Sequence, residues 1–292
     1  MRLEELRIYA GVVESQLRTC YFGPPPEPLP GEHWMQAATR EIRKRCPGTQ
    51  VSTDDNNGTE AEGDAETLTT PSSPRYAYCS DRDDDNDGDV VIIYPAQYPG
   101  GLYVSCSGKW IVIQRRYVAA VNFTRSWAEY RDGFGDLENS FWLGNEIVRQ
   151  LTSEGTWELK VALTSLDNPG SWAAVYLRDF QIVGDEYQLL ASINPSYSMG
   201  HSLIDVHTGQ LFSTYDHDND DDGNANCAAE LKGGWWFKTC TGGVGTEDLV
   251  PSNLNGEYSY PVNYTGQDYR GMRWASAFDG RMSCEISIHR YL

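Results

Sequence analysis

The stretch from Phe212 to Cys240 reads FSTYDHDNDDDGNANCAAELKGGWWFKTC. Its first half crowds carboxylates into seven positions, at Asp216, Asp218, Asp220, Asp221 and Asp222. Carboxylates this close repel one another unless water or a cation neutralises them. Calcium accepts roughly six to eight oxygen ligands, both carboxylate and carbonyl, which alternate positions of a tight loop can supply. We therefore interpret the stretch as a calcium-binding loop, with a solvated acidic turn as the alternative.

The spacing of Asp218, Asp220 and Asp222, followed by Gly223, resembles the opening of an EF-hand loop. Position twelve of that loop carries a bidentate glutamate, and here it is Ala229, so an EF-hand closure is excluded. The same spacing occurs a second time, at Asp83, Asp85 and Asp87. This second loop predicts either a weak additional calcium site or a plain solvated turn.

The charge balance restricts the classes of partner and activity. In 292 residues, 23 basic side chains face 42 acidic ones, and a net charge of -19 disfavours nucleic acid and anionic membrane surfaces. No apolar run approaches the roughly 20 residues that cross a bilayer, so we expect no membrane insertion. The five histidines form no HExxH motif, and neither a GxSxG motif nor a complete phosphate loop occurs, so we do not expect an enzyme.

The cysteines favour the secretory route. The seven cysteines form no CxxC pairs and have no histidine cluster beside them, which favours disulfides over zinc. Their odd number leaves one thiol free or bridging chains. Glycosylation sequons occur at Asn57, Asn122 and Asn263. We expect an extracellular glycoprotein whose secretion signal is missing from this chain.

The first 75 residues differ in composition from the remainder. Residues 1–20 place apolar side chains at heptad spacing, at Leu3, Leu6, Ala10, Val13 and Leu17. This predicts the end of a coiled-coil stalk, crosslinked through Cys20, that makes a homo-oligomer; a single amphipathic helix is the alternative. Residues 21–75 are first rich in proline and then acidic, which predicts a flexible linker.

From residue 76 onward, the patterns indicate a domain of the α+β class. Short alternating runs at 109–114, 156–163, 173–183 and 187–193 predict strands of a central twisted antiparallel sheet, and residues 281–292 predict a closing strand. Ser126 and Glu129 form a capping box for one short helix, and residues 144–152 predict another. Residues from about 194 to 280 read as a loop-rich lobe.

Several motifs resemble the fibrinogen C-terminal domain shared by fibrinogens, ficolins, tachylectins, angiopoietins and tenascins. They are WIVIQRR (110–116), NFTRSWAEYRDGFGDLENSFWLGNE (122–146), FSTYDHDND (212–220), NCAAELKGGWWFKTC (226–240) and SNLNGEY (252–258). The resemblance covers residues 76–292. It implies a secreted, oligomeric binding protein whose ligand site lies beside a calcium ion.

The resemblance also implies particular residue roles. The family's disulfides fall on Cys79 with Cys106 and on Cys227 with Cys240. Cys20, Cys46 and Cys284 lie outside the family's pairs, and a pairing of Cys46 with Cys284 is a separate suggestion. Its calcium ligands fall on the side chains of Asp218 and Asp220 and the carbonyl groups of Asp222 and Asn224. The loop is one residue longer than usual, which leaves the carbonyls of Gly223 or Ala225 as alternatives.

The ligand pocket that the resemblance implies lies between the second disulfide and Trp274, past a cis peptide bond before Cys240. Its residues here are Leu231, Thr239, Cys240, Thr241, Asp268 and Tyr269. Leu231, Thr241 and Asp268 replace a tyrosine, a histidine and a tyrosine of the family. The insertion from 242 to 251 predicts a flap, and the acidic rim favours a cationic ligand over an anion. Trp235 and Trp236 are either sugar platforms or core residues.

Two functions follow from these expectations. The first is a secreted, calcium-binding, lectin-like recognition protein of innate immunity that binds glycans or acetylated or amino groups on microbial or cell surfaces. The alternative is a matrix or signalling ligand, like tenascins or angiopoietins, that binds a protein receptor and whose pocket is vestigial.

Overall fold

An antiparallel sheet forms the middle of the molecule. The computed structural model describes residues 75–82, 88–166, 170–193, 206–240, 252–258, 270–274, 278–279 and 282–291. The chain divides into two units, Met1–Arg75 and Tyr76–Leu292, and the second contains nearly all of the described residues. The predicted stalk, the predicted linker up to residue 74 and the second acidic loop at Asp83, Asp85 and Asp87 lie outside the described residues.

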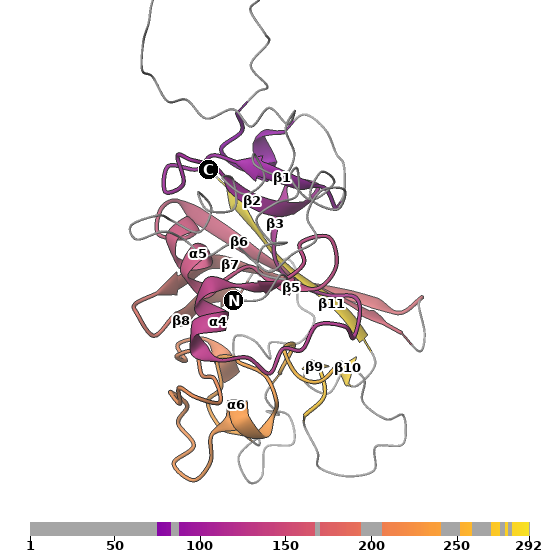
Figure 1. Cartoon of the computed structure of the whole chain (residues 1–292), viewed down its shortest axis with the longest axis vertical. Coiled ribbons are helices and arrows are strands. Elements are labelled where there is room, and N and C mark those ends of the chain that lie inside the picture. The colour runs from indigo at the N-terminus through magenta and orange to yellow at the C-terminus, as the bar shows by residue number, and fades with distance from the viewer. Residues whose placement is uncertain are drawn as a thin grey trace, which may run out of the picture. The chain divides into compact units, whose positions relative to one another are not determined.

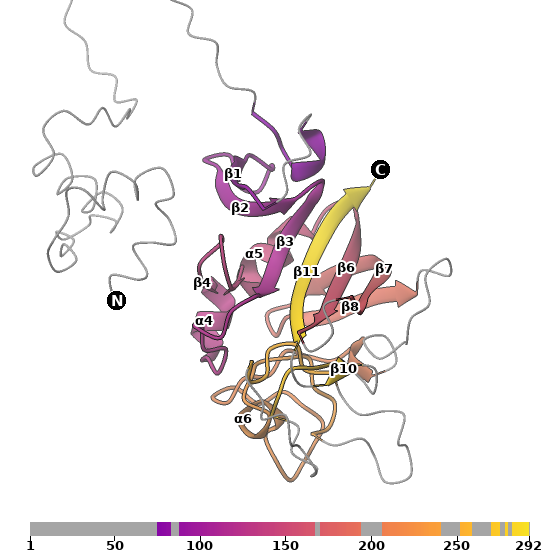
Figure 2. The ribbon, with the colours of Figure 1, turned by 90° about the vertical axis from the view of Figure 1, so that its right-hand side faces the viewer.

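Nine described strands form this sheet, in the order β1-β2-β3-β11-β6-β7-β8, with β5 beside β3 and β4 beside β5 (Figures 1 and 2). Their bounds are β1 Val90–Ile93, β2 Leu102–Ser107, β3 Trp110–Arg116, β4 Phe134–Gly135, β5 Phe141–Trp142, β6 Thr156–Ser165, β7 Trp172–Val183, β8 Gln188–Ile193 and β11 Met282–Tyr291. The α+β prediction and the central antiparallel sheet are confirmed.

The closing strand β11 lies between β3 and β6, far from both in sequence. Ten residues of β11 pair with ten residues of β6. The alternation of β6 buries Trp157, Leu159, Val161 and Leu163. An alternating apolar strand of this kind places one face on the core, so the alternation read from the sequence explains why these distant segments pair.

Two short helices cover part of the sheet, α4 at Trp127–Asp132 and α5 at Asn145–Leu151. The capping box of α4 is present, since Glu129 N donates to Ser126 Oγ (3.3 Å) and Ser126 N donates to Glu129 Oε2 (2.9 Å). Both predicted helices are confirmed. Tyr130 on α4 and Leu151 on α5 are fully buried, so each helix contributes one face to the core.

Strand β3 carries polar side chains that hold a distant loop. Gln114 Nε2 donates to the carbonyl of Leu254 (3.0 Å), and the buried Arg116 donates to the carbonyl of Gly256 (2.8 Å). The Arg116 guanidinium lies 3.8 Å from the ring centroid of Phe123. Burial lowers the pKa of Arg116 to about 10. These bonds fix the segment 252–258 against the sheet.

A lobe of loops lies at the end of the sheet where β11 begins (Figures 1 and 2). We call residues 206–240, 252–258 and 270–274 the loop lobe. Its regular elements among the described residues are the helix α6 at Cys227–Glu230 and the strand β9 at Arg273–Trp274, which pairs with β10 at Phe278–Asp279. The prediction of a loop-rich lobe is confirmed for these residues.

Two disulfides join Cys79 to Cys106 and Cys227 to Cys240, as the family resemblance implied. The suggested pairing of Cys46 with Cys284 is wrong. Cys284 is a free thiol that is 1% exposed, and its Sγ donates to Gln114 Oε1 (3.3 Å). The reason is its place on β11, where the sulfur is buried against Gln114 and the carbonyl of Leu254 (4.0 Å).

Candidate metal and ligand site

The acidic loop is organised by its own carboxylates. Asp220 N donates to Asp218 Oδ1 (3.3 Å), and Asp222 N donates to Asp220 Oδ1 (2.9 Å). Asn224 N in turn donates to Asp222 Oδ1 (3.3 Å). Three successive contacts from a side chain to the amide two residues later curl the backbone. The predicted metal residues Asp218, Asp220, Asp222 and Asn224 are therefore linked in one loop.

Two of these carboxylates also bind the segment closed by the disulfide between Cys227 and Cys240, which we call the disulfide hairpin. Asp220 Oδ2 accepts a hydrogen bond from Cys227 N (2.9 Å), and Asp222 Oδ2 accepts one from Cys240 N (3.3 Å). Each aspartate thus contacts the backbone of one cysteine of the pair. The acidic loop and the hairpin therefore form a single structural unit, which we call the loop–hairpin unit.

The donor set fits a hard divalent cation. Burial, together with the adjacent Asp218 carboxylate, raises the pKa of Asp220 to about 6, although two backbone hydrogen bonds act to lower it. Two carboxylates in contact, one of them half-buried, are stabilised in ionised form by a cation. Their oxygens and the neighbouring carbonyls are the ligands that calcium prefers. Asp220 and Asp222 each use both side-chain oxygens for backbone amides, so a cation would share these oxygens with the hydrogen bonds of the loop.

A sulfur-rich metal site is not supported at this place. Ligand atoms of Asp220, Cys227 and Cys240 lie within 4.8 Å of one another. The two sulfurs, however, are joined to each other in the disulfide, so neither is a thiolate. Zinc sites in proteins use thiolate, imidazole or carboxylate groups, and this trio offers one carboxylate alone.

Side chains outside the predicted set anchor the loop. Asp216 Oδ1 accepts from Trp127 N (2.8 Å), so the start of α4 is tied to the acidic loop. Asn226 Oδ1 accepts from Ala229 N (2.8 Å) and caps α6. Sequence analysis missed both roles, although an asparagine directly before CAAE is a recognisable N-cap signal.

A buried histidine connects two parts of the lobe. His207 Nδ1 lies 2.7 Å from the carbonyl oxygen of Trp236, and its Nε2 accepts from Ser252 N (3.0 Å). These contacts require a neutral ring with its proton on Nδ1. Burial lowers the pKa of His207 to about 4, which agrees with a neutral ring. Sequence analysis assigned no role to this histidine, because no motif marks it.

The structure places half of the predicted pocket residues. Leu231 is 5% exposed and packs in the core, where its carbonyl accepts from Asn253 Nδ2 (2.9 Å). Cys240 is buried and Thr239 is half-buried beside it. Three predicted residues, Thr241, Asp268 and Tyr269, and the insertion from 242 to 251, lie outside the described residues.

The peptide bond before Cys240 is trans, as are the others in the described part of the chain. The expectation of a cis bond between Thr239 and Cys240 is therefore wrong. A cis bond that does not precede proline costs about 3–4 kcal/mol. In the trans arrangement the amide of Cys240 already reaches Asp222, so the hairpin satisfies this donor without isomerisation.

Trp235 and Trp236 belong to the core. They are 0% and 4% exposed, and the indole of Trp236 donates to the carbonyl of Tyr187 (2.7 Å). The interpretation as sugar platforms is therefore not supported. Of the three sequons, Asn122 is exposed, and Asn57 and Asn263 lie outside the described residues.

The sheet, the disulfide hairpin and the acidic loop define a fibrinogen-like globe. The family model for the C-terminal globular domain of fibrinogen beta and gamma chains matches residues 76–289, and the chain belongs to this family. Its members include non-enzymatic binding proteins such as ficolins and angiopoietins, so the expectation of a binding protein without enzymatic activity is confirmed.

Three curated relatives illustrate the range of the family. Human ficolin-3 is 40% identical over 58% of this chain and 52% of its own length. The mouse fibrinogen C domain-containing protein 1 is 36% identical over 69% of this chain and 43% of its own length. Bovine angiopoietin-4 is 43% identical over 57% of this chain and 31% of its own length. The chain thus matches about half or less of these relatives.

Two solved structures share the fold. The fibrinogen-like globe of human ANGPTL6 superposes with a TM-score of 0.64 at 28% identity, covering 77% of this chain and 100% of that one. The lamprey fibrin D-dimer, in complex with Gly-His-Arg-Pro-amide, gives 0.61 at 26% identity, covering 88% of this chain and 84% of that one. In the described residues, no helix is long and apolar enough to span a membrane.

Proposed function

We propose that this chain is an extracellular, calcium-dependent recognition protein. Its ligand is a glycan or an acetylated or amino group on a microbial or cell surface, bound beside the hairpin at Leu231, Thr239, Cys240, Thr241, Asp268 and Tyr269. The observation that supports this proposal most is that Asp220 and Asp222 each accept a backbone hydrogen bond from one cysteine of the hairpin. A cation at this loop would therefore stabilise the wall of the pocket.

Several features support the remaining parts of the proposal. Two disulfides among the described residues favour an oxidising compartment. The exposed sequon at Asn122 is compatible with glycosylation on the same route. Oligomerisation through the stalk at residues 1–20 would turn weak single-site contacts into useful avidity.

The proposed metal site is tested with a matched pair of variants. Asp218→Asn removes a predicted ligand charge and keeps the shape of the side chain, whereas Asp221→Asn removes the same charge from an exposed carboxylate in the same loop. Calcium at about 100 times its dissociation constant stabilises a protein by about 2.7 kcal/mol. We expect added calcium to raise the melting temperature of the wild type and of Asp221→Asn by several degrees, and not that of Asp218→Asn. Equal calcium shifts in all three proteins would remove the assigned site.

Ligand binding is tested on a glycan array with calcium and with a chelator. Binding to an acetylated or amino sugar that is lost with the chelator supports the proposal. Absence of such binding, together with tight capture of a protein receptor, decides for the second candidate function.

That second candidate is a matrix or signalling ligand with a vestigial pocket. Trp172 favours it, because this side chain is 72% exposed at the start of β7. Exposed tryptophans are enriched among the residues that dominate binding between proteins. The burial of Leu231 favours it as well, since a buried leucine offers less surface to a small ligand.

A further inference from the structure

A glutamate in the turn between β7 and β8 contacts both neighbours of Asp218. The side chain of Glu186 lies in the turn between β7 and β8, about thirty residues before the acidic loop. Its Oε2 accepts from Asn219 Nδ2 (2.7 Å) and lies 2.7 Å from His217 Nε2. A contact of this length between a ring nitrogen and a carboxylate oxygen requires the proton on Nε2. One oxygen therefore holds the residues on either side of Asp218.

This arrangement holds the chain on both sides of Asp218. His217 and Asn219 are fixed to Glu186 through their side chains. The side chain of Asp218 between them turns along the loop, where its Oδ1 accepts from Asp220 N (3.3 Å). The contacts of Glu186 therefore restrain the residues on either side of the first proposed calcium ligand.

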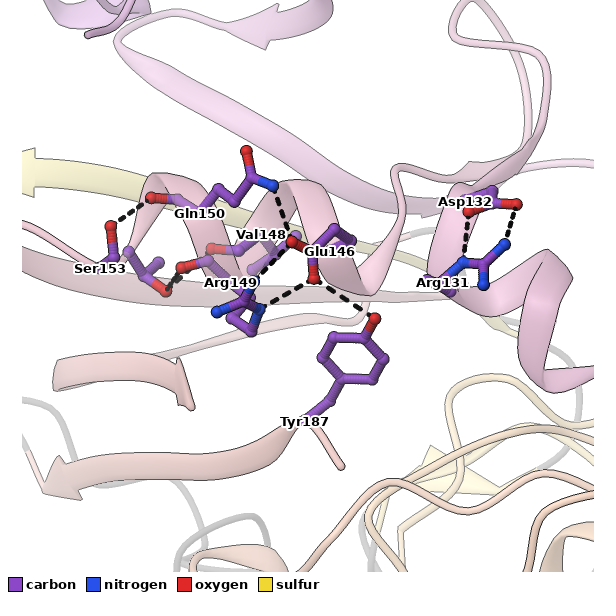
Figure 3. A network of polar contacts seen from close by, with 9 residues as sticks. Arg131, Asp132, Glu146, Val148, Arg149, Gln150, Ser153 and Tyr187 are labelled. Carbon is purple, nitrogen blue, oxygen red and sulfur yellow. Dashed lines mark hydrogen bonds and ion pairs between the residues drawn. The ribbon is translucent and has the colours of Figure 1, made fainter. Parts of the chain in front are cut away.

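The position of Glu186 does not depend on the acidic loop. Its carbonyl accepts from Phe212 N (3.0 Å). The next residue, Tyr187, has a φ of 50° and donates its hydroxyl to Glu146 on α5 (3.4 Å, Figure 3). Figure 3 also shows the hydrogen bonds that Arg149 and Gln150 donate to Glu146. The turn is therefore anchored to α5 and to Phe212, outside the acidic residues 216–222.

Aromatic stacking fixes the orientation of His217, one of the two partners of Glu186. The ring of Trp127 stacks on His217 at 4.1 Å with an interplanar angle of 20°. It also stacks on Tyr187 at 5.3 Å with an angle of 30°. Stacked aromatic pairs stabilise their relative orientation. The imidazole is thereby held in the orientation that reaches Glu186.

We propose that Glu186 is a positioning residue for calcium binding, acting through His217 and Asn219 on Asp218 and Asp220. The inference rests on the proposed function, since it assigns the cation to the same loop. Partners that orient metal ligands commonly change metal affinity by about 10- to 100-fold when they are removed. The effect requires no contact between Glu186 and the ion.

The test is isothermal titration of the full chain with calcium chloride. We expect Glu186→Ala to raise the calcium dissociation constant at least about tenfold, with a nearly unchanged melting temperature in chelator. Glu186→Gln keeps an acceptor oxygen and loses the charge, so we expect its dissociation constant to stay within about threefold of the wild type. Asp185→Ala removes the same charge from the exposed neighbouring residue and serves as the control.

The outcomes separate this inference from the proposed function. Wild-type affinity in Glu186→Ala, with binding lost in Asp218→Asn, overturns the positioning role and leaves the metal site intact. Equal weakening in Glu186→Gln and Asp185→Ala also overturns it, because charge alone then explains the effect. A wild-type chain that binds no calcium overturns both. If Glu186→Ala does not fold, His217→Phe keeps the stack on Trp127 and removes the bond to Glu186, and unchanged calcium affinity in that variant overturns the role.

Discussion

In the sheet, β6 and β11 pair over ten residues and bury alternating apolar side chains. In the loop lobe, residues 206–240 contain one four-residue helix and a few isolated bridges. There the backbone is held by hydrogen bonds with side chains. Asp220 and Asp222 accept from backbone amides of the hairpin. His207 connects Trp236 to Ser252, and Asn255 Nδ2 donates to the carbonyl of Gly234 (2.8 Å). The sheet therefore depends on apolar burial, and the lobe depends on polar groups whose charge state and ligands matter.

The largest expected loss of unfolding free energy comes from a substitution in the sheet. Trp157→Ala removes a buried indole from β6, and such truncations cost about 3–5 kcal/mol. We expect this loss of unfolding free energy, measured by chemical denaturation, to be the same with calcium and with chelator. Trp172→Ala on the adjacent strand is the matched control, and we expect it to change stability by less than about 0.5 kcal/mol because this side chain is exposed. A calcium-dependent loss in Trp157→Ala would contradict the separation of the two regions.

The next effect is a response of the lobe to acid. The pKa of His207 is about 4 in the folded chain, below its ordinary value of 6.5. Between these values the unfolded chain binds a proton at His207 that the folded chain does not, so the contribution of His207 to the unfolding free energy decreases as the pH falls from 6.5 to 4. A pKa shift of this size corresponds to a change of about 3 kcal/mol in the unfolding free energy. The raised pKa of Asp220 contributes with the opposite sign, and this contribution is common to the wild type and a His207 variant.

Denaturation of the wild type and of His207→Gln across this pH range measures the effect. Glutamine has a donor and an acceptor but does not titrate. As the pH falls from 6.5 to 4, we expect the unfolding free energy of the variant to rise relative to that of the wild type by about 2–3 kcal/mol. Identical pH profiles of the two proteins would show that His207 is not the source of acid sensitivity in the lobe.

The smallest expected effect is at the boundary of the two regions. Ser126→Ala removes the N-cap of α4, whose first amide binds Asp216 of the acidic loop. Loss of a serine cap costs about 1 kcal/mol. Thermal unfolding checks this value, and Ser126→Thr, which keeps the hydroxyl, should lie close to the wild type. A loss in Ser126→Thr as large as in Ser126→Ala would mean that the hydroxyl is not the stabilising group.

Much of the sheet could be predicted from the sequence, because alternation in β6 and β11 and the capping box at Ser126 are local patterns. The loop lobe could not be predicted in the same way. The contacts of Glu186 with His217 and Asn219 join segments about thirty residues apart, and the bonds from Gln114 to Leu254 and Asn255 join segments about 140 residues apart. No local periodicity encodes such pairs.

In the candidate site, too, some features could be predicted from the sequence and others could not. Five acids between Asp216 and Asp222 indicated a cation from the sequence alone. The family resemblance gave the two disulfide pairs that the structure contains. The pairing of Cys46 with Cys284, which lay outside the family's pairs, failed because the Cys284 thiol is free and bonded to Gln114. The cis bond before Cys240, which the resemblance implied, failed as well. The family pattern thus carried over for the disulfides and failed at the peptide bond whose amide donates to Asp222.

The free thiol of Cys284 makes the opening of the sheet measurable. Burial raises its pKa to about 12, so it reacts with alkylating reagents only when the structure around β11, including the segment at Leu254, opens. In a chain whose Cys20 and Cys46 are replaced by serine, the rate of maleimide labelling at neutral pH would report how often the centre of the domain opens. The same cysteine offers a spectroscopic or fluorescent tag site that becomes accessible only in the denatured protein.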